Sequence, residues 1–329
     1  MRRLLIALLL TVFVALGGAG LWFWSYLVTP APGRGEVVVT IPKGTGVRDI
    51  GALLAGHGIL DNDIRYLALV SVSGLKSRLK AGEYSIPLGM TPPEVLDLLA
   101  SGRTLRHHVT IPEGLTAAQI AAIFAQGGWV KQDRFLALVA DGAFIRQLGI
   151  EAQSLEGYLF PETYTLVRNE ADEAAVIRMM VARFQQVWPT LGAAEFRTLN
   201  RHQLLTLASI VEKETGAAAE RPLIARVFYN RLAKKMRLQS DPTVSYGIAD
   251  FNGTLTKADL KRETPYNTYV IPGLPPGPIC NPGRAALEAV LHPDESDALY
   301  FVSKNDGTHV FSTDLAEHNR AVQQYQRSQ

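Results

Sequence analysis

Two glutamates at the end of an apolar segment are the residues whose type and spacing best suit acid–base chemistry. The segment 204–215 reads LLTLASIVEKET. In a helix, its large apolar side chains share one broad face, Lys213 points away from it, and Glu212 and Glu214 fall near its margins. A carboxyl group that is partly withdrawn from water keeps its proton to a higher pH and can act as a general acid. The same spacing also suits a helix end whose glutamates reach water.

The residues after this segment predict a second helix that folds back against the first. Gly216 can end a helix over 203–215, and Pro222 suits the first position of the next helix. Glu220 then lies at the positively polarised start of the second helix, where a carboxylate is favourable without any catalytic role. We therefore predict a helical hairpin that brings the acidic end of one helix beside the start of the other.

Polar and aromatic side chains gather in four segments, at 155–164, 238–247, 264–269 and 273–283. Prolines stiffen the last three, so these loops can hold polar groups toward a ligand at little ordering cost. Aromatic faces beside hydrogen-bonding groups, as in the first segment, suit a carbohydrate-binding cleft. The alternative is that the aromatic residues are core and that the Asn and Asp side chains bond their own backbone. The candidate binding residues are Glu162, Tyr164, Gln239, Asp241, Thr243, Tyr246, Tyr266, Asn267, Thr268 and Tyr269.

The chain begins with an apolar segment that can anchor the other elements to a membrane. Arg2 and Arg3 precede an uncharged run over residues 4–28, which is long enough to span a bilayer and ends in aromatic residues. The arginines favour a cytoplasmic amino terminus and place the rest of the chain outside the cytoplasm. A cleaved signal peptide is the rival, but the run continues well past the small residues at 15–17. We expect an anchor over 1–28 and a short Pro/Gly linker over 29–35, which keeps the body near the bilayer.

One strand–turn–helix pattern occurs three times, at 39–44, 84–89 and 109–114, with the helix-like spacing following each. In each copy a proline stops the strand and a glycine supports the turn. The first two copies can pair as a compact β-α-α-β module over 36–105, which resembles the LysM-like modules that hold glycan chains of the bacterial wall. An ordinary packing or spacer domain is the alternative. The remaining residues, 106–329, alternate helical stretches with long loops and fit an α+β domain.

Composition excludes several classes of function. Thirty-three basic and thirty-one acidic side chains nearly cancel, so the chain has no electrostatic footprint for nucleic acid. Cys280 is the only cysteine, which rules out an intramolecular disulfide. The sequence contains no zinc-hydrolase, serine-hydrolase, Walker or complete dinucleotide motif, and adjacent His107 and His108 would face opposite ways on a strand. We therefore expect no metal and no cofactor, which leaves chemistry by carboxylates.

Five sequence blocks, taken in order, resemble the YceG/MltG family of endolytic murein transglycosylases. They are LEGYLFPETY at 155–164, ASIVEKET at 208–215, RLQSDPTV at 237–244, YNTY at 266–269 and GLPPGPI at 273–279. Asn281, Tyr300, Phe311 and His318 extend the similarity to almost the whole chain. The resemblance implies a bacterial inner-membrane protein with one transmembrane helix, a LysM-like module and a larger α+β catalytic domain outside the cytoplasm.

The resemblance also implies the reaction and its acid. The second glutamate of the Glu-Lys-Glu motif, Glu214 here, is expected to be catalytic, and Glu212 becomes a supporting carboxylate. The expected reaction cleaves the bond between N-acetylmuramic acid and N-acetylglucosamine and forms a 1,6-anhydro end, which terminates glycan strand elongation. Glycan strands are the expected partners, together with the membrane through residues 4–28 and, as the family suggests, peptidoglycan synthases.

Two other functions fit the same residues. A tethered scaffold could bind the wall through its first module without any catalysis. A glycoside hydrolase could use Glu214 with Glu212, Glu162 or Asp241 as its second carboxylate. The spacing of these carboxyl groups in the folded chain, and the product formed, separate the alternatives.

Overall fold

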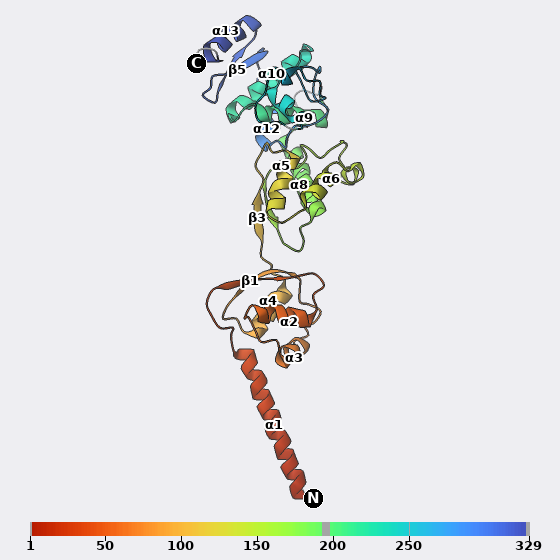
Figure 1. The fold of residues 1–329 in the computed structure, drawn as a ribbon, viewed down its shortest axis with the longest axis vertical. Helices are drawn as coiled ribbons and strands as arrows, with labels where there is room; N and C mark the ends of the chain where they lie inside the picture. The colour runs from red at the N-terminus through yellow and green to blue at the C-terminus, as the bar shows by residue number, and fades with distance from the viewer. Residues whose placement is uncertain (1, 193–197, 250, 327–329) are drawn as a thin grey trace. The chain divides into compact units, whose positions relative to one another are not determined.

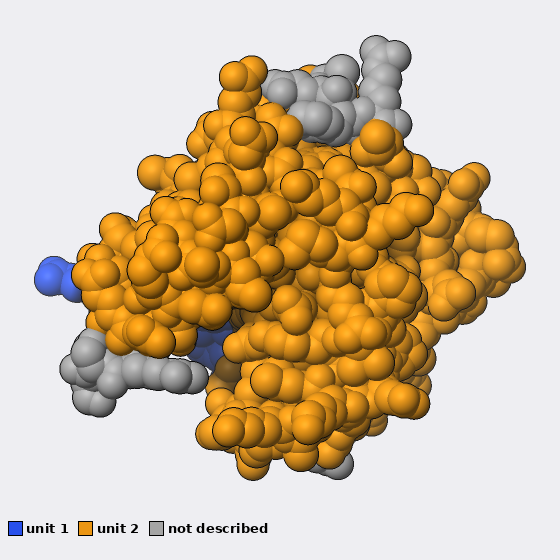
Figure 2. Space-filling view, turned by 90° about the horizontal axis from the view of Figure 1, so that it is seen from above, with its two compact units in different colours: residues 1–108, 165–171 blue, residues 109–164, 172–329 orange. Residues whose placement is uncertain are grey.

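The computed structural model describes residues 2–192, 198–249 and 251–326, and it divides into two compact units. The small unit contains residues 1–108 and 165–171, and the large unit contains residues 109–164 and 172–329. Figure 1 labels the helices and strands, and Figure 2 colours the two units separately. Helices and short two-stranded sheets make up both units, as the α+β prediction requires.

The predicted apolar segment forms the long helix α1 (Arg2–Val28), which projects from the rest of the small unit (Figure 1). Within the described residues it is the one helix that is long and apolar enough to cross a membrane. A signal sequence can have the same length and apolar composition. Its 27 residues give it a length of roughly 40 Å, at about 1.5 Å per residue.

The rest of the small unit has the predicted β-α-α-β order, followed by one more helix. Its elements are β1 (Glu36–Ile41), α2 (Val47–Gly56), α3 (Ile64–Val72), β2 (Gly82–Pro87) and α4 (Pro92–Ser101). Strands β1 and β2 pair antiparallel, with Val39 opposite Tyr84, and both of these side chains are buried in the core of the unit. Helices α2 and α3 approach closely because α2 has Gly51 at the contact, where a Cβ atom would lie 2.6 Å from the Tyr66 ring.

All three sequence repeats have the predicted strand, turn and helix. After each strand a glycine has positive φ, 82° at Gly44, 98° at Gly89 and 75° at Gly114, which other residues adopt less easily. The third repeat consists of β3 (His107–Thr110) and α5 (Ala117–Gln126), and β3 pairs with β4 (Thr163–Leu166).

Helices dominate the large unit. After α5 come α6 (Gln132–Val139), α7 (Gly142–Gln147), α8 (Glu173–Val187), α9 (Arg201–Glu214), α10 (Arg221–Ala233), α11 (Asp241–Tyr246) and α12 (Arg284–Leu291), with single 3₁₀ turns at Trp188–Leu191, Ala218–Glu220 and Asp259–Lys261. A hairpin of β5 (Tyr300–Ser303) and β6 (His309–Ser312) follows, and the described chain ends with α13 (Leu315–Gln326).

Helix α9 is the central element of this unit. Its residues 204–211 are all buried. It packs against α10 and α12, which are labelled near it in Figure 1, and against α11. The prediction of one apolar face is therefore too narrow for residues 204–211, which neighbours cover on every side, whereas Lys213 is exposed as predicted. The helical hairpin with α10 is confirmed, although α9 ends one residue earlier than predicted because Thr215 is extended (φ −145°, ψ 139°).

One predicted loop contains a helix. Residues 241–246 form α11, in which Pro242 occupies the first turn, where a proline does not interrupt the hydrogen-bond pattern. The prediction that Pro242 stiffens a loop is therefore wrong, because Pro242 helps to begin a short helix. Thr243 and Tyr246 thus lie on a helix that packs against α9.

Candidate active site

Glu214, the last residue of α9, lies in a cavity of about 500 Å³ in the large unit. The walls come from α9, from α10, from the segment before α11, from Tyr269 and from the β5–β6–α13 region. The residues that line the cavity are Glu214, Arg231, Leu238, Gln239, Asp241, Tyr269, Tyr300, Phe301, Val302, Ser303, His309, Leu315, His318, Asn319, Val322 and Gln326. The cavity thus combines carboxyl, imidazole, amide and aromatic groups around the end of one helix.

The surroundings of Glu214 raise its pKa to about 7, from an ordinary value of 4.5. Burial is the main cause, because it penalises the charged form of the carboxyl. A hydrogen bond donated by the Ser240 hydroxyl to Oε1 lowers the pKa, the negative charge of Asp241 raises it, and the positive charge of Arg231 lowers it. Near neutral pH, Glu214 is therefore partly protonated and can both give and take a proton.

Arg231 holds the walls of the cavity together. Its buried guanidinium donates from Nε to the carbonyl of Leu299 (2.7 Å) and from Nη1 to the carbonyl of Leu238 (2.7 Å). These bonds connect α10 to the segment before β5 and to the segment that carries Ser240. Because both of these nitrogens bond to backbone, Arg231 is a structural cation beside Glu214.

A layer of buried threonines positions Ser240. Gln239 has a positive φ of 50°, and its N–H donates to the Thr268 carbonyl (3.2 Å). The Ser240 N–H donates to Thr268 Oγ1 (3.0 Å), which in turn lies 2.8 Å from Thr243 Oγ1. Thr243 and Thr268 are fully buried, so they support the loop from behind and do not line the cavity.

Asp241 and Tyr269 form a pair on the cavity wall. The Tyr269 hydroxyl donates to Asp241 Oδ1 (2.7 Å). Asn267 shapes the loop behind them, because its buried amide donates to the carbonyls of Asp259, Leu260 and Arg262, and its Oδ1 accepts from the Tyr269 N–H (2.9 Å). Of the predicted binding residues, the structure places Gln239, Asp241 and Tyr269 in the cavity with Glu214.

Tyr246 and Tyr266 belong to a different cluster, around Glu156. Their rings meet edge to face at 4.8 Å, and the Tyr246 hydroxyl donates to Glu156 Oε2 (3.3 Å). The buried Glu156 carboxyl also accepts from the Ala117 N–H (3.0 Å) and from Asn281 Nδ2 (2.7 Å), and burial raises its pKa to about 7. Glu156 lies in the quoted sequence motif but was not among the predicted site residues, since nothing in its spacing distinguishes a buried bridging carboxyl.

Glu212, Glu162 and Tyr164 lie outside the residues that line the cavity. Glu212 accepts from Arg221 Nη2 (3.0 Å) and from the Gly283 N–H (2.9 Å), so it connects α9 to α10 and to the start of α12. Glu162 forms an ion pair with Arg183. Tyr164 is buried and donates its hydroxyl to the Phe160 carbonyl.

The wall formed by the last strands and helix was not anticipated. Glu220 accepts from the His309 N–H (2.9 Å) and from the His309 imidazole at Nδ1 (2.7 Å), so Nε2 is the ring nitrogen of this cavity residue that does not contact Glu220. His318 stacks on Tyr300 with ring centres 5.1 Å apart, and its buried Nδ1 has no hydrogen-bond partner within the described part of the chain. The sequence motif includes Tyr300 and His318, but only the fold shows that they face Glu214.

The described residues contain no group of three or more His, Cys, Asp or Glu side chains that could hold a metal ion. The chemistry available in the cavity is proton transfer by carboxyl and imidazole groups, together with hydrogen bonding and stacking against rings.

Comparisons with known proteins agree along nearly the whole chain. The model of the YceG-like family matches residues 39–324. A Bacillus subtilis protein named endolytic murein transglycosylase is 35% identical over 327 residues, which cover 94% of this chain and 91% of that protein. A Streptococcus pneumoniae protein of the same name is 32% identical, and the match covers 96% of this chain and 64% of that protein. The crystal structure of a putative YceG-like protein from Listeria monocytogenes has a TM-score of 0.57 and 33% identity, covering 88% of this chain and 100% of its own.

Proposed function

The chain belongs to the YceG-like family, and on that premise we propose that it is an endolytic lytic transglycosylase of peptidoglycan. It cleaves the glycosidic bond between N-acetylmuramic acid and N-acetylglucosamine within a glycan strand, with Glu214 as its catalytic residue. The observation that carries this proposal is a carboxyl with a pKa of about 7 inside a cavity that has aromatic and imidazole walls.

In the proposed mechanism a single carboxyl transfers both protons. Protonated Glu214 gives its proton to the glycosidic oxygen as the bond from that oxygen to the muramic acid C1 breaks. The ionised Glu214 then takes the proton from the C6 hydroxyl of the same muramic acid, and O6 forms a bond to C1. The product carries a 1,6-anhydro ring, no water is consumed, and Glu214 ends in its starting protonation state.

The other cavity groups bind the sugars in this proposal. Gln239, Asp241 and Tyr269 offer hydrogen bonds on one side, while the aromatic residues Tyr300 and Phe301 line the other. His309 presents Nε2 to a sugar hydroxyl because Glu220 holds its other nitrogen. Thr243, Asn267 and Thr268 support this wall from behind.

A hydrolase is the second candidate because Asp241 shares the cavity with Glu214. A second carboxylate can activate a water molecule or attack the sugar, and either route adds water to the product. Asp241 already accepts a hydrogen bond from Tyr269, which favours a binding role over that of a base.

The proposal includes the setting of the enzyme. Helix α1 anchors the chain in the inner membrane as a single span, with residues 1–28 as anchor and cytoplasmic tip, 29–35 as linker and the catalytic domain, 106–329, outside the cytoplasm. The β-α-α-β order of residues 36–105 supports a LysM-like module that holds glycan near the bilayer. The cleaved strands are then nascent ones, and synthases are the proposed partners.

The experiment compares products from purified glycan strands treated with the wild type, Glu214→Gln and Glu288→Gln. Glu288 is a half-exposed residue of α12. The wild type and Glu288→Gln should both release fragments that end in anhydromuramic acid, detected by mass spectrometry. Glu214→Gln should release none while keeping the circular dichroism spectrum of the wild type. Fragments heavier by one water than the anhydro products would identify a hydrolase. In a separate experiment, unchanged wall function in cells that carry Glu214→Gln would identify a scaffold.

A further inference from the structure

The last turns of α1 belong to the hydrophobic core of the small unit. Tyr26 is only 4% exposed, and Phe23 and Leu27 pack against the same core. The Tyr26 hydroxyl donates to the Asp61 carbonyl (3.0 Å), and in the linker the Ala31 N–H donates to the Met90 carbonyl (3.0 Å). The apolar helix and the folded module thus share one core, so the module is not carried on a loose tether.

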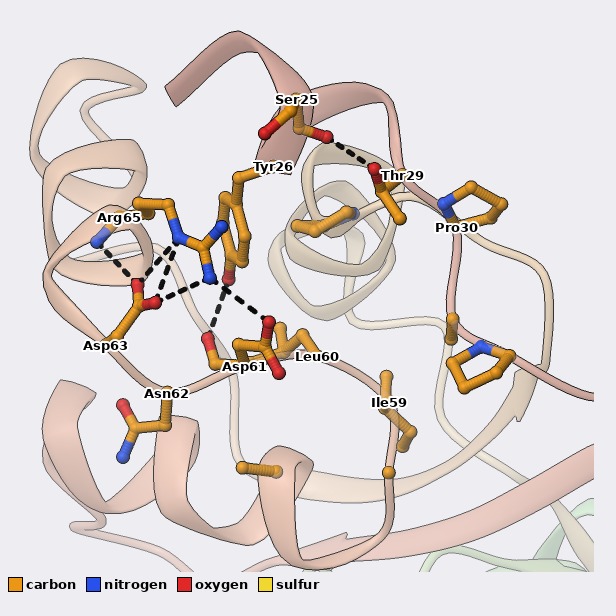
Figure 3. A pocket seen from close by; sticks show the side chains of 15 residues that line it. Ser25, Tyr26, Thr29, Pro30, Ile59, Leu60, Asp61, Asn62, Asp63 and Arg65 are labelled. Carbon is orange, nitrogen blue, oxygen red and sulfur yellow. Dashed lines mark hydrogen bonds and ion pairs between the residues drawn. The ribbon is translucent and has the colours of Figure 1, made fainter. Parts of the chain in front are cut away.

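Arg65, the second residue of α3, fastens α3 to the end of α1. Its guanidinium lies 4.8 Å from the centre of the Trp22 ring and 4.7 Å from that of Tyr26. Asp63 and Asp61 orient it, through Nε to Asp63 Oδ2 (2.9 Å) and Nη2 to Asp61 Oδ2 (3.1 Å), as Figure 3 shows. A cation over the face of an aromatic ring is attracted by the negative charge of that face.

These contacts fix the depth of α3 once α1 spans a bilayer. Residues 4–22 rise roughly 28 Å as a helix, which nearly matches a hydrocarbon core of about 30 Å. The exposed side chains of Trp22 and Trp24 then lie in the interface, where aromatic side chains concentrate. Because Arg65 touches Trp22, the start of α3 lies at the level of the lipid headgroups.

At this level α3 turns an uncharged face outward. Ile64 is 68% exposed and Val72 is 81% exposed, and they lie within about 80° of each other around the helix. Ala68 and Ser71 occupy the same sector, and the exposed Lys76 and Arg78 follow the helix. The acidic Asp61 and Asp63 before the helix are paired with Arg65. Apolar residues followed by unpaired basic ones favour a surface of anionic lipid.

We propose that this face of α3 is a membrane-contact surface, whose partner is the outer leaflet of the bilayer that holds α1. Ile64 and Val72 insert among the headgroups, while Lys76 and Arg78 pair with lipid phosphates. Together with the Arg65 contacts, this surface holds the small unit flat on the membrane in one orientation. The inference rests on the proposed insertion of α1 and is independent of the chemistry at Glu214.

The test uses the full chain in vesicles of phosphatidylethanolamine and phosphatidylglycerol, with an environment-sensitive fluorophore on single introduced cysteines. The wild type gives the labelling background, because its one cysteine, Cys280, is buried. Lipids carrying a nitroxide near the headgroup should quench the labels on Ile64→Cys and Val72→Cys. We expect this quenching to be at least about twofold stronger than that of the control label. The control is Val38→Cys, a 49% exposed valine of β1, which lies away from α1 (Figure 1).

Two further variants separate the ways in which the proposal can fail. A label on Leu10→Cys, within α1, should be quenched by nitroxides deep in the bilayer, which verifies insertion. If the label at position 10 is quenched while quenching at positions 64 and 72 is no stronger than at position 38, the membrane-contact surface is refuted and the anchor stands.

Arg65→Gln should reduce the quenching at position 72 while the circular dichroism spectrum stays unchanged. Cross-linking between two copies through position 72, without lipid quenching, would assign the surface to a dimer and overturn the proposal.

Discussion

At the scale of single residues, burial and three neighbours set the pKa of Glu214. Burial raises this pKa. The neighbours oppose each other, since the Ser240 hydroxyl and the Arg231 charge favour the ionised carboxyl and the Asp241 charge disfavours it. Activity that begins with protonated Glu214 must fall as the pH rises through the pKa of that group.

Ser240→Ala and Asp241→Asn should shift the alkaline limb of the pH profile, where activity falls, in opposite directions. Loss of the Ser240 hydroxyl removes stabilisation of the charged form, so the pKa rises and the limb moves to higher pH. Loss of the Asp241 charge lowers the pKa and moves the limb to lower pH. The measurement is kcat/KM for glycan cleavage against pH, which reports groups of the free enzyme. Limbs that stay in place in both variants would assign the titration to another group.

His309 provides a prediction about sugar binding. His309→Asn retains a nitrogen near the position of Nδ1, and thus the contact with Glu220, but it removes Nε2 from the cavity. We expect KM to rise by about tenfold with a smaller change in kcat, which is the effect of losing one hydrogen bond to bound substrate. His309→Gln, which retains a polar group near Nε2, should recover part of the loss. Equal KM values for the wild type and His309→Asn would remove His309 from the binding surface.

At the scale of elements, local signals predicted much of what the structure contains. The three strand–turn–helix repeats and the α9–α10 hairpin follow from proline, glycine and apolar spacing, which act over a few residues. Local patterns could not reveal that β5, β6 and α13 form a cavity wall, because His309 and Glu214 are brought together only by long-range packing. Nor could spacing tell that Thr243 and Asn267 face inward, since buried and exposed polar residues have the same sequence signal.

Glu212 and Arg221 join α9 to α10, and removing one partner should destabilise the large unit. Glu212→Ala leaves the buried Arg221 guanidinium without its carboxylate and the Gly283 N–H without an acceptor. We expect a loss of about 3–5 kcal/mol in the free energy of unfolding, measured by urea denaturation. The exposed Arg284–Glu288 pair is the matched control, and Glu288→Ala should cost less than about 1 kcal/mol. A loss below 1 kcal/mol at Glu212 would mean that this pair does not hold the helices together.

At the scale of the whole molecule, two buried carboxyls connect stability to pH. Glu156 and Glu214 have pKa values near 7 in the folded chain, above their ordinary value of 4.5. The folded state therefore binds more protons than the unfolded state between these values, and the free energy of unfolding falls as the pH rises through that window.

Each group should lower the free energy of unfolding by up to ~3.5 kcal/mol across this window. In Glu214→Gln the group cannot ionise, so the variant should gain stability over the wild type at pH 8 and little at pH 4. Thermal unfolding at the two pH values measures the difference. If Glu214→Gln gained the same stability at pH 4 and at pH 8, ionisation of Glu214 would have no part in the effect of pH.

The most direct test of the central claim is a carbon-13 NMR titration of the glutamate carboxyls, with Glu214 assigned from the signal that Glu214→Gln lacks. We expect a midpoint near pH 7 for Glu214. A midpoint near the ordinary value of 4.5 would mean that the carboxyl is already ionised at neutral pH, and Glu214 could not then be the acid that begins the reaction.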